Sequence, residues 1–306
     1  MKVYTSIDQF EKLDNAVVTT GTFDGVHIGH QKIISRLKEI AKLDNGETVL
    51  LTFFPHPRVV LFPDNDDLKM LSTEEEKISL LDHYGIDHLI IHPFTKEFSR
   101  LGSVEFVSNI LVNKIGTKKL VIGYNHHFGR NREGTFEHLK EFGHIYGFNV
   151  EEIPAQDIDN VNVSSTKIRN AILAGDIKTA SLYLGHLYSL SGVVVEGNKL
   201  GRTIGFPTAN LFVEHNYKMI PLNGVYAVDV SVSGTKYSGM LNIGHRPTIG
   251  KSEKSIEVNI FDFDEDIYNQ KIIIYFKERI RDEIKFPDLN ALKDQLTKDK
   301  ITASLL

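Results

Sequence analysis

The sequence predicts an α/β fold class, in which a doubly wound domain precedes a small C-terminal antiparallel β-barrel with a terminal helix. Up to about residue 183, apolar β-rich runs alternate with segments of helical periodicity, which is typical of a parallel sheet covered by helices on both faces. From about residue 184, short strands follow one another with Gly, Asn and Ser turns and no helices between them. The chain of 306 residues is about twice as long as a usual domain. We therefore expect two domains, 1–183 and 184–306.

The first domain shows apolar strand candidates separated by helical stretches. The strand candidates are AVVTTG (16–21), ETVLLTFF (47–54), HLIIHPF (88–94), KLVIG (119–123) and FNVEEI (148–153). The helical stretches include 30–43, 73–84 and 103–114. Ser72 or Thr73 caps the second of these helices, and the glutamates that follow favour the positive end of its dipole.

The second domain shows strand candidates without intervening helices, and then one final helix. The strand candidates are 191–197, 224–234, 235–244, 255–263 and 270–280. The helix is predicted over 287–300, and we expect Leu289, Leu292 and Leu296 to form the face that packs on the barrel.

Composition excludes several classes of function. The absence of cysteine excludes disulfides, thiolate metal sites and cysteine nucleophiles, and it suits a reducing cytoplasm. A net charge of −5 gives no electrostatic reason to expect nucleic acid or an anionic membrane as partner. The N-terminus does not resemble a signal peptide, and no apolar run approaches the roughly 18 residues that span a bilayer. We expect a cytoplasmic protein with small-molecule substrates, for which a weak homo-oligomer is allowed.

The clearest chemical signal is GTFDGVHIGH (21–30), where a buried strand ends and a helix begins. Exposed backbone N–H groups and the helix dipole attract an anion at such a place, and His27 and His30 can donate charge-assisted hydrogen bonds to it. Two alternatives to phosphate binding remain, namely a histidine that caps the helix and a pair of metal ligands. No nearby carboxylate completes an obvious ligand set for a metal.

The H-x-G-H pattern after the first strand is similar to the nucleotidyltransferase superfamily. Over nearly its whole length, the chain resembles the bifunctional riboflavin kinase/FAD synthetase family of prokaryotic type. FFPHPRVVL (53–61), GYNHHFGRNREG (123–134) and VSSTKIR (163–169) support the resemblance because they occur in the expected order. It implies that the H-x-G-H histidines contact ATP phosphates during adenylyl transfer. The implied phosphate or ATP contacts in this loop are Gly21, Phe23, Gly25, His27, Gly29 and His30.

The segment FFPHP follows a strand and is the first candidate flavin contact. Pro55 and Pro57 rigidify a loop that presents Phe54 and His56, which suit the flanks of a planar ring system. A plain structural loop is the alternative. The resemblance assigns all four residues to flavin binding.

The segment GYNHHFGRNREG is the second candidate flavin contact. Asn125 carries both a donor and an acceptor for the edge of a heterocycle, whereas Arg130 and Arg132 are equally explained as a solvated basic turn. His126 and His127 stand where the family often carries other aromatic or acidic residues.

The segment SSTKIR resembles the second phosphate-contact element of the family. Ser164, Ser165 and Thr166 are expected to begin a helix, with Arg169 one turn inside it. A Ser/Thr helix cap alone also explains the hydroxyls.

The second domain contains a basic glycine-rich loop, GNKLGRTIGFPTANL (197–211), that lacks the Walker pattern. Gly197, Gly201 and Gly205 surround Lys199 and Arg202, which suits phosphate binding, although structural turns of a barrel would look the same. We take all five as candidate ATP contacts.

The PTAN sequence that follows resembles the riboflavin kinase signature. Thr208 and Asn210 are hard oxygen donors that suit Mg²⁺, and the resemblance makes them its ligands. Strand alternation in SIEVNIFDF places Glu257 on the face opposite Ile256 and Val258. The resemblance makes Glu257 the general base. The alternative is a solvated carboxylate without a role in catalysis.

Two further segments complete the second domain. The acidic run 262–271 begins like a calcium loop, but Ile267 stands where an EF-hand needs glycine, so we interpret it as a charged hairpin turn. The region 277–286 resembles the flavin-covering part of the family, with Arg281 and Phe286 as flavin contacts.

The sequence therefore predicts a transferase with riboflavin kinase and FMN adenylyltransferase activities, using ATP, riboflavin and FMN as substrates and Mg²⁺ as cofactor. One alternative retains adenylyl transfer alone, with the barrel as a flavin holder, but Thr208, Asn210 and Glu257 disfavour it. Another is a flavin-responsive regulatory protein that contacts RNA. The acidic balance and the lack of a basic, aromatic-interleaved segment disfavour that alternative.

Overall fold

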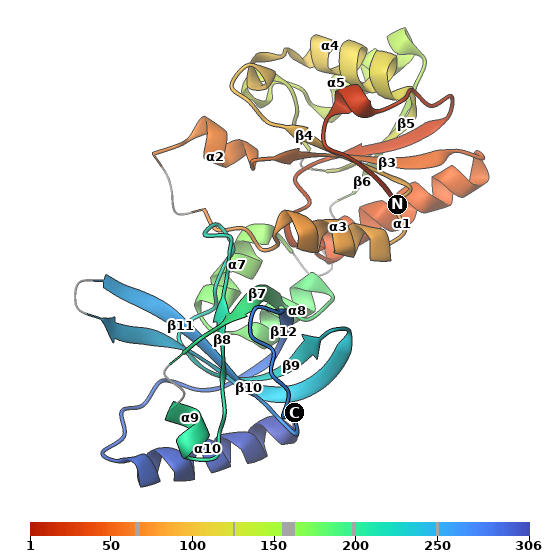
Figure 1. Cartoon of the computed structure of the whole chain (residues 1–306). Helices are drawn as coiled ribbons and strands as arrows, with labels where there is room; N and C mark the ends of the chain where they lie inside the picture. Colours follow the sequence, from red (N-terminus) through yellow and green to blue (C-terminus); the bar gives the residue numbers. More distant parts are fainter. Residues whose placement is uncertain (65–67, 125, 155–162, 198–199, 249–250) are drawn as a thin grey trace. The chain divides into compact units, whose positions relative to one another are not determined.

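The protein is described here by a computed structural model that divides into two compact units, Met1–Ser164 and Ser165–Leu306 (Figure 1). The residues that the structure describes are 1–64, 68–124, 126–154, 163–197, 200–248 and 251–306. Helices α7 (Ser165–Leu173) and α8 (Ile177–Leu184) pack on each other within the second unit. The division by contacts therefore falls before α7, and the functional boundary at 183/184 stays a prediction.

The first unit is built on a six-stranded parallel sheet with the strand order β1-β4-β3-β2-β5-β6. The strands are β1 (Lys2–Tyr4), β2 (Ala16–Thr20), β3 (Glu47–Phe54), β4 (His88–Pro93), β5 (Thr117–Gly123) and β6 (Asn149–Ile153). Every residue of the central strand β2 is buried, as expected for a strand covered on both faces. From β2 the chain builds outward through β3 and β4, and it then crosses back to place β5 on the other side of β2.

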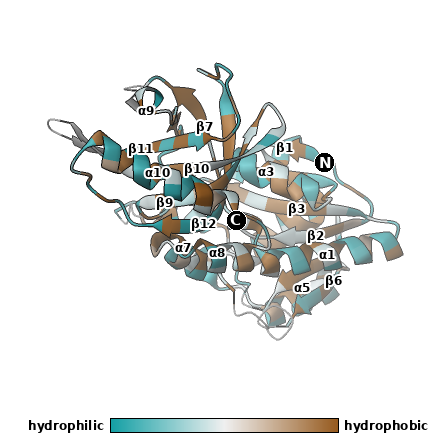
Figure 2. Cartoon of the chain, turned by 90° about the horizontal axis from the view of Figure 1, so that it is seen from below, coloured by the Kyte–Doolittle hydropathy of each residue, from teal (hydrophilic) through white to brown (hydrophobic). Residues whose placement is uncertain are grey.

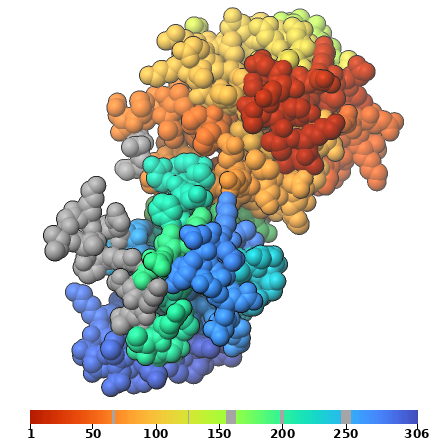
Figure 3. Space-filling view, viewed as in Figure 1, coloured from red at the N-terminus to blue at the C-terminus, as the bar shows by residue number. Residues whose placement is uncertain are grey.

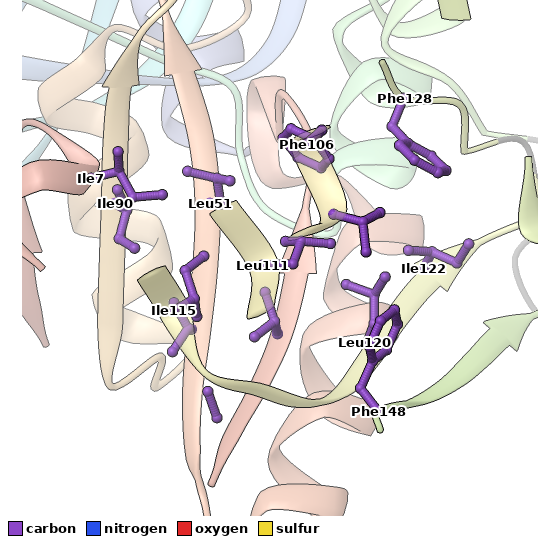
Figure 4. Packing of buried hydrophobic residues seen from close by; sticks show 14 of the residues in the cluster. Ile7, Leu51, Ile90, Phe106, Leu111, Ile115, Leu120, Ile122, Phe128 and Phe148 are labelled. Atoms are coloured by element: carbon purple, nitrogen blue, oxygen red, sulfur yellow. The ribbon is translucent and has the colours of Figure 1, made fainter. Parts of the chain in front are cut away.

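Helices cover both faces of this sheet and create two apolar cores. The helical segments are η1 (Ile7–Gln9), η2 (Asp24–Val26), α1 (Ile28–Leu43), α2 (Pro57–Leu61), α3 (Glu74–His83), η3 (Phe98–Arg100), α4 (Ser103–Glu105), the π-helical η4 (Phe106–Ile115), η5 (Arg130–Arg132) and α5 (Phe136–Tyr146). One core packs Leu111 and Ile115 of η4 against Leu51 and Leu120 (Figure 4). The other core packs α1 and α3 against the opposite face.

The second unit is a closed six-stranded barrel with the strand order β10-β11-β8-β7-β12-β9. Its strands are β7 (Ser189–Val195), β8 (Ala209–Phe212), β9 (Gly224–Val232), β10 (Thr235–Thr248), β11 (Lys251–Ile260) and β12 (Lys271–Arg281). The short helix α9 (Leu200–Thr203) and the terminal helix α10 (Leu289–Ser304) complete the unit. In Figure 2, α10 shows both polar and apolar residues along its length, as an amphipathic surface helix should.

The predicted α/β class with a C-terminal antiparallel barrel is confirmed, and several elements follow the predicted bounds closely. Strand β3 has the predicted bounds, and α3 begins after Thr73 in a capping box with Glu76. The expectation for the terminal helix was partly wrong. Leu289 is 51% exposed, whereas Leu296 packs against the barrel core, and the residues that α10 buries are Asp299 and Ala303.

Candidate active sites

The segment Gly21–His30, here called the histidine loop, begins where β2 ends and continues into α1. Strand β2 lies between β3 and β5, at the point where the order of the strands reverses. Open α/β sheets bind ligands outside the carboxyl ends of their strands at such a switch point. The fold therefore places the histidine loop where a ligand site is expected.

Three residues of the histidine loop have a backbone φ in the left-handed region. Phe23 has φ of 46°, Gly25 of 78° and Val26 of 41°. Glycine adopts such angles without steric cost, but Phe23 and Val26 do not, and a β-branched residue there is a marked outlier. Gly21 is also tightly placed, because a Cβ there would lie 3.1 Å from the Phe23 ring. Strain of this kind persists only where neighbouring contacts fix the backbone.

The segment Leu71–Lys77 supplies those contacts. The buried carboxylate of Asp24 accepts hydrogen bonds from the backbone N–H groups of Leu71 at 3.0 Å and Ser72 at 3.2 Å. The Ser72 hydroxyl accepts one from the Gly25 N–H at 3.2 Å. Lys77 Nζ donates to the Thr22 carbonyl at 2.8 Å. None of these roles was predicted, because Asp24 and Lys77 resemble solvated charges when only the sequence is considered.

His27 and His30 stack on each other at the start of α1. Their ring centroids lie 3.7 Å apart with an angle of 14° between the planes, and the Phe23 ring lies 4.6 Å from that of His30. His27 caps the helix, because its Nδ1 accepts a hydrogen bond from the His30 N–H at 3.4 Å. The helix-cap alternative is therefore realised for His27, and it leaves the ring beside the positive end of the helix dipole.

The environment of His30 keeps its ring uncharged at neutral pH. Burial, then the neighbouring His27, then the Lys77 ammonium hold the pKa of His30 well below its usual value. Its Nδ1 is buried and has no hydrogen-bond partner in the structure. The described residues contain no cluster of three or more His, Cys, Asp or Glu side chains suited to a metal ion. Two stacked imidazoles at a helix N-terminus can donate hydrogen bonds to an anion.

The loop after β3 carries the predicted flavin contacts on the surface. Phe54 is 38% exposed, and His56 caps α2 by accepting from the Arg58 N–H at 3.1 Å. Pro57 occupies the first position of α2, a place where its missing N–H costs nothing, and Pro55 is exposed. This segment lies in the orange part of the surface in Figure 3. Apolar side chains continue beyond it at Val59, Leu61 and Phe62.

The loop after β5 carries a histidine with an unusual environment. Asn125 lies outside the described residues, so its flavin contact stays a prediction. Burial, followed by repulsion from His127 and Arg132, lowers the pKa of His126 to about 4, and its Nε2 is buried without a hydrogen-bond partner. Arg130 and Arg132 are exposed on η5, as the solvated-turn alternative expects.

The SSTKIR segment spans the division between the units. Ser164 ends the first unit, and Ser165 is the first residue of α7, as the predicted helix start requires. Thr166 is exposed and Arg169 half-buried on that helix. Their phosphate contacts stay predictions.

In the second unit, a cavity of about 560 Å³ lies beside the PTAN segment. Arg202, Pro207 and Thr208 line one part of it. The loop Phe263–Tyr268 lines another part, which gives the acidic run a place in the wall of the cavity that the sequence did not predict. Lys199 lies outside the described residues.

Three polar side chains lie in one row across neighbouring barrel strands, next to Ala209 and Val258, which line this cavity. Asn210 of β8 pairs with Glu257 of β11, and Glu257 pairs in turn with Asn242 of β10. Residues directly opposite each other in an antiparallel pair point to the same face. The Thr208 hydroxyl donates to Glu257 Oε2 at 3.4 Å. Thr208, Asn210 and Glu257 are thereby brought together, and Asn242 is a candidate that the sequence analysis missed.

Burial along β11 follows the predicted alternation from Ile256 to Val258 and departs from it at Asn259. Ile256 and Val258 are buried in the barrel and Glu257 is half-buried. Asn259 is also buried, and its Nδ2 donates to the Pro207 carbonyl at 2.6 Å. This hydrogen bond ties the PTAN segment to the strand that carries Glu257.

The three glycines of the phosphate loop have different structural reasons. A Cβ on Gly197 would clash with the side chain of Asn210, and one on Gly201 would clash with the Phe206 carbonyl. Gly205 has φ of 86° and open space around it. The first two glycines therefore permit close approach, and the third permits a left-handed turn.

Arg281 is occupied by a contact within the unit. Its Nε lies 3.0 Å from both carboxylate oxygens of Asp299, and its Nη2 lies 2.6 Å from Oδ2. The guanidinium also lies over the Phe286 ring, with 5.9 Å between its carbon and the ring centroid. This geometry attaches α10 to β12, and flavin contacts of Arg281 and Phe286 stay predictions.

Another cavity, of about 600 Å³, lies in the first unit near the amino ends of β3 and β4. Lys38, Thr48 and Asp87 are among its lining residues. Because open α/β sheets bind ligands at the carboxyl ends of their strands, the larger volume does not make this cavity the active site.

Comparison with known proteins identifies the family. Residues 9–167 match the family model for FAD synthetase, and residues 184–306 match the model for riboflavin kinase. The chain is 40% identical over 305 residues to a bifunctional riboflavin kinase/FMN adenylyltransferase of Buchnera aphidicola subsp. Schizaphis graminum, with 98% of this chain and 96% of the relative covered. The chain belongs to the bifunctional riboflavin kinase/FMN adenylyltransferase family. It is therefore a transferase with both activities.

One further relative and one solved structure match nearly the whole chain. The relative of that name from Bacillus subtilis (strain 168) is 36% identical, with 95% of this chain and 92% of the relative covered. A crystal structure described as a macrolide-efflux protein from Streptococcus pneumoniae has a TM-score of 0.91 and 34% identity, and covers 99% of this chain and 98% of its own. Among the described residues of the present chain, no helix is long and apolar enough to cross a membrane.

Proposed function

We propose that FMN adenylylation takes place at the histidine loop and that riboflavin phosphorylation takes place at the row Asn210–Glu257–Asn242. Two observations support this assignment. The histidines stack at a helix N-terminus that follows the central strand at its switch point. Thr208, whose hydroxyl donates to Glu257, lines a cavity of about 560 Å³ together with Arg202.

At the histidine loop, the proposed reaction needs donors rather than a base. The phosphate of FMN is already anionic, so it attacks the α-phosphorus of ATP directly and pyrophosphate leaves with its electron pair. Backbone N–H groups in the first turn of α1 and the two imidazoles would stabilise the negative charge that grows during this step. The neutral state of His30 suits a donor that gains a charge-assisted bond only when phosphates arrive. Phe54 and His56, at the end of the neighbouring strand β3, would flank the flavin.

At the barrel site, Glu257 would accept the proton of the riboflavin 5′-hydroxyl as the oxygen attacks the γ-phosphorus of ATP. A positioned general base contributes about 10²- to 10⁴-fold in rate. Positioning of the two substrates in the cavity supplies more, and the glycines at 197 and 201 let the phosphate loop approach PTAN closely.

The donor set beside the cavity fits Mg²⁺. Thr208 Oγ1 and the side-chain oxygen of Asn210 are hard, uncharged donors, and Glu257 supplies a carboxylate within 3.4 Å of Thr208. We propose Thr208 and Asn210 as the residues that hold the ion. When bound, it would neutralise charge on the ATP phosphates.

We also propose that the protein works in the cytoplasm, where ATP, riboflavin and FMN are its partners. The absence of cysteine suits a reducing compartment.

A product assay on two point variants tests the two-site assignment. With riboflavin, ATP and Mg²⁺, the His30→Ala variant should accumulate FMN without FAD. The Glu257→Gln variant should make no FMN from riboflavin but should still convert supplied FMN into FAD. His83→Ala is a matched control, because His83 lies at the far end of α3. If either variant, still folded, lost both activities, the assignment of separate sites would be wrong.

A further inference from the structure

Lys77 stands out because a lysine of α3 is half-buried against the histidine loop. Lysine side chains are rarely buried without a partner, since removal of the ammonium from water is costly. Here the partner is a backbone carbonyl, to which Nζ donates at 2.8 Å. That carbonyl belongs to Thr22, directly before Phe23 in the histidine loop.

The Thr22 carbonyl is a position from which the loop geometry can be controlled. It belongs to the same peptide plane as the Phe23 N–H, so a fixed carbonyl fixes one side of the Phe23 φ rotation. Phe23 adopts φ of 46°, and its ring lies 4.6 Å from that of His30. The Lys77 hydrogen bond therefore acts on a strained residue that contacts His30 directly.

Asp24 provides a second attachment of the same loop to the same segment. Its carboxylate is bound by the backbone N–H groups of Leu71 and Ser72, six and five residues before Lys77. Lys77 thus holds the histidine loop at the Thr22 carbonyl, and the backbone N–H groups of Leu71 and Ser72 hold it at the Asp24 carboxylate. Removal of Lys77 would release only the attachment that precedes Phe23.

The charge of Lys77 also acts on the histidine pair. Loss of water around the ammonium lowers the pKa of Lys77, and attraction to Asp24 and Glu74 partly offsets this shift. The same ammonium repels a proton on His30, in addition to the repulsion from His27. A fixed positive charge here favours anionic phosphates over a protonated ring.

We propose that Lys77 is a positioning residue for adenylyl transfer, which holds the histidine loop through the Thr22 carbonyl and adds a positive charge near the histidine pair. This inference rests on the proposed function of the histidine loop. Lys77 need not touch the substrate for either effect.

Three substitutions separate the two effects. Lys77→Met removes the donor and the charge, Lys77→Gln removes the charge but keeps a donor, and Lys77→Arg keeps both. The exposed Lys42, in the last turn of α1, gives the control substitution Lys42→Met. The readouts are kcat and KM for ATP in FMN adenylylation between pH 5 and 9. The riboflavin kinase rate of the same chain is the internal measure of folding.

We expect Lys77→Met to lower kcat for adenylylation about 10²-fold, the cost of misplacing a catalytic group by about 1 Å. The riboflavin kinase rate should stay within about twofold of the unsubstituted chain. Loss of the charge raises the pKa of His30, so the acid limb of the kcat profile should move to higher pH in Lys77→Met and Lys77→Gln. In Lys77→Arg the limb should stay in place.

The proposal is overturned if Lys77→Met matches Lys42→Met in adenylylation while His30→Ala abolishes it. It is also overturned if the acid limb stays unmoved in a folded Lys77→Gln variant, which decides the matter should Lys77→Met fail to fold. If His30→Ala itself retained adenylylation, the proposed function of the loop would fail instead.

Discussion

The two candidate sites hold their functional side chains in different ways. At the first site, a single loop of ten residues carries both histidines, and long-range contacts from Leu71, Ser72 and Lys77 keep it in a strained conformation. At the second, Asn210, Glu257 and Asn242 lie on paired strands, so the sheet register places them. The first site thus depends on a few side-chain contacts with the loop, and the second on the closure of the barrel.

The largest effect on the second site is expected when the terminal helix α10 loses its attachment to β12. Arg281→Met leaves the Asp299 carboxylate buried, with the Gln295 amide as its remaining side-chain donor among the described residues. Breaking a buried ion pair in this way costs about 3–5 kcal/mol. We expect the free energy of unfolding of the barrel unit to fall by that amount and riboflavin kinase activity to fall with it, as measured by urea denaturation and product assay. Adenylylation of supplied FMN should persist, and equal loss of both activities would contradict the separation.

The corresponding substitution at the first site is Asp24→Ala, which removes one attachment of the histidine loop. It leaves the buried N–H groups of Leu71 and Ser72 without their acceptor, at a cost of about 1–3 kcal/mol for each group that stays unpaired. FAD formation from FMN should fall at least tenfold, while FMN formation from riboflavin is retained. Retention of full adenylylation would show that the loop does not need this attachment.

A finer test compares two glycines of the phosphate loop. Gly197→Ala places a methyl group against Asn210, whereas Gly205→Ala meets no atom and incurs only the left-handed backbone cost of about 1 kcal/mol. We expect kcat/KM for riboflavin phosphorylation to fall about tenfold for Gly197→Ala and less for Gly205→Ala. The reverse order would mean that the turn, rather than the approach to Asn210, controls the site.

The smallest effect concerns the pH dependence of the first unit. The pKa of His126 is lowered from 6.5 to about 4 in the folded chain. Between these pH values, His126 binds a proton in the unfolded chain and stays neutral in the folded chain. The stability that His126 contributes is therefore full above about pH 6.5 and is lost as the pH falls toward 4. His126→Phe should raise the free energy of unfolding at pH 5 more than at pH 8. An equal change at both values would contradict the buried, neutral state of the ring.

Much of the fold could be predicted because apolar runs report burial directly. Strand β3 has its predicted bounds, and burial at Ile256 and Val258 follows the predicted alternation. Strand β8 was missed because it has only four residues, and Pro207 and Thr208 before it suggested a loop. Its existence depends on pairing with β7 and β11, which are distant in the sequence.

The candidate sites were predictable where a motif concentrates the chemistry, and not where distant residues support it. His27 and His30 lie within one motif, and Thr208 and Asn210 lie within another. Asp24 and Lys77 act across 47 and 55 residues on backbone groups, for which a charged residue in the sequence carries no signal. The contact of Arg281 with Asp299, 18 residues away on α10, likewise left no signal in the sequence.

Complementation between two inactive chains tests the independence of the sites most directly. The His30→Ala and Glu257→Gln variants are mixed with riboflavin, ATP and Mg²⁺, and FAD is followed over time, with each variant alone as a control. Neither variant alone should make FAD from riboflavin, whereas the mixture should, because FMN released by the first is adenylylated by the second. A mixture that makes FMN but no FAD, although the Glu257→Gln chain converts supplied FMN, would contradict the account.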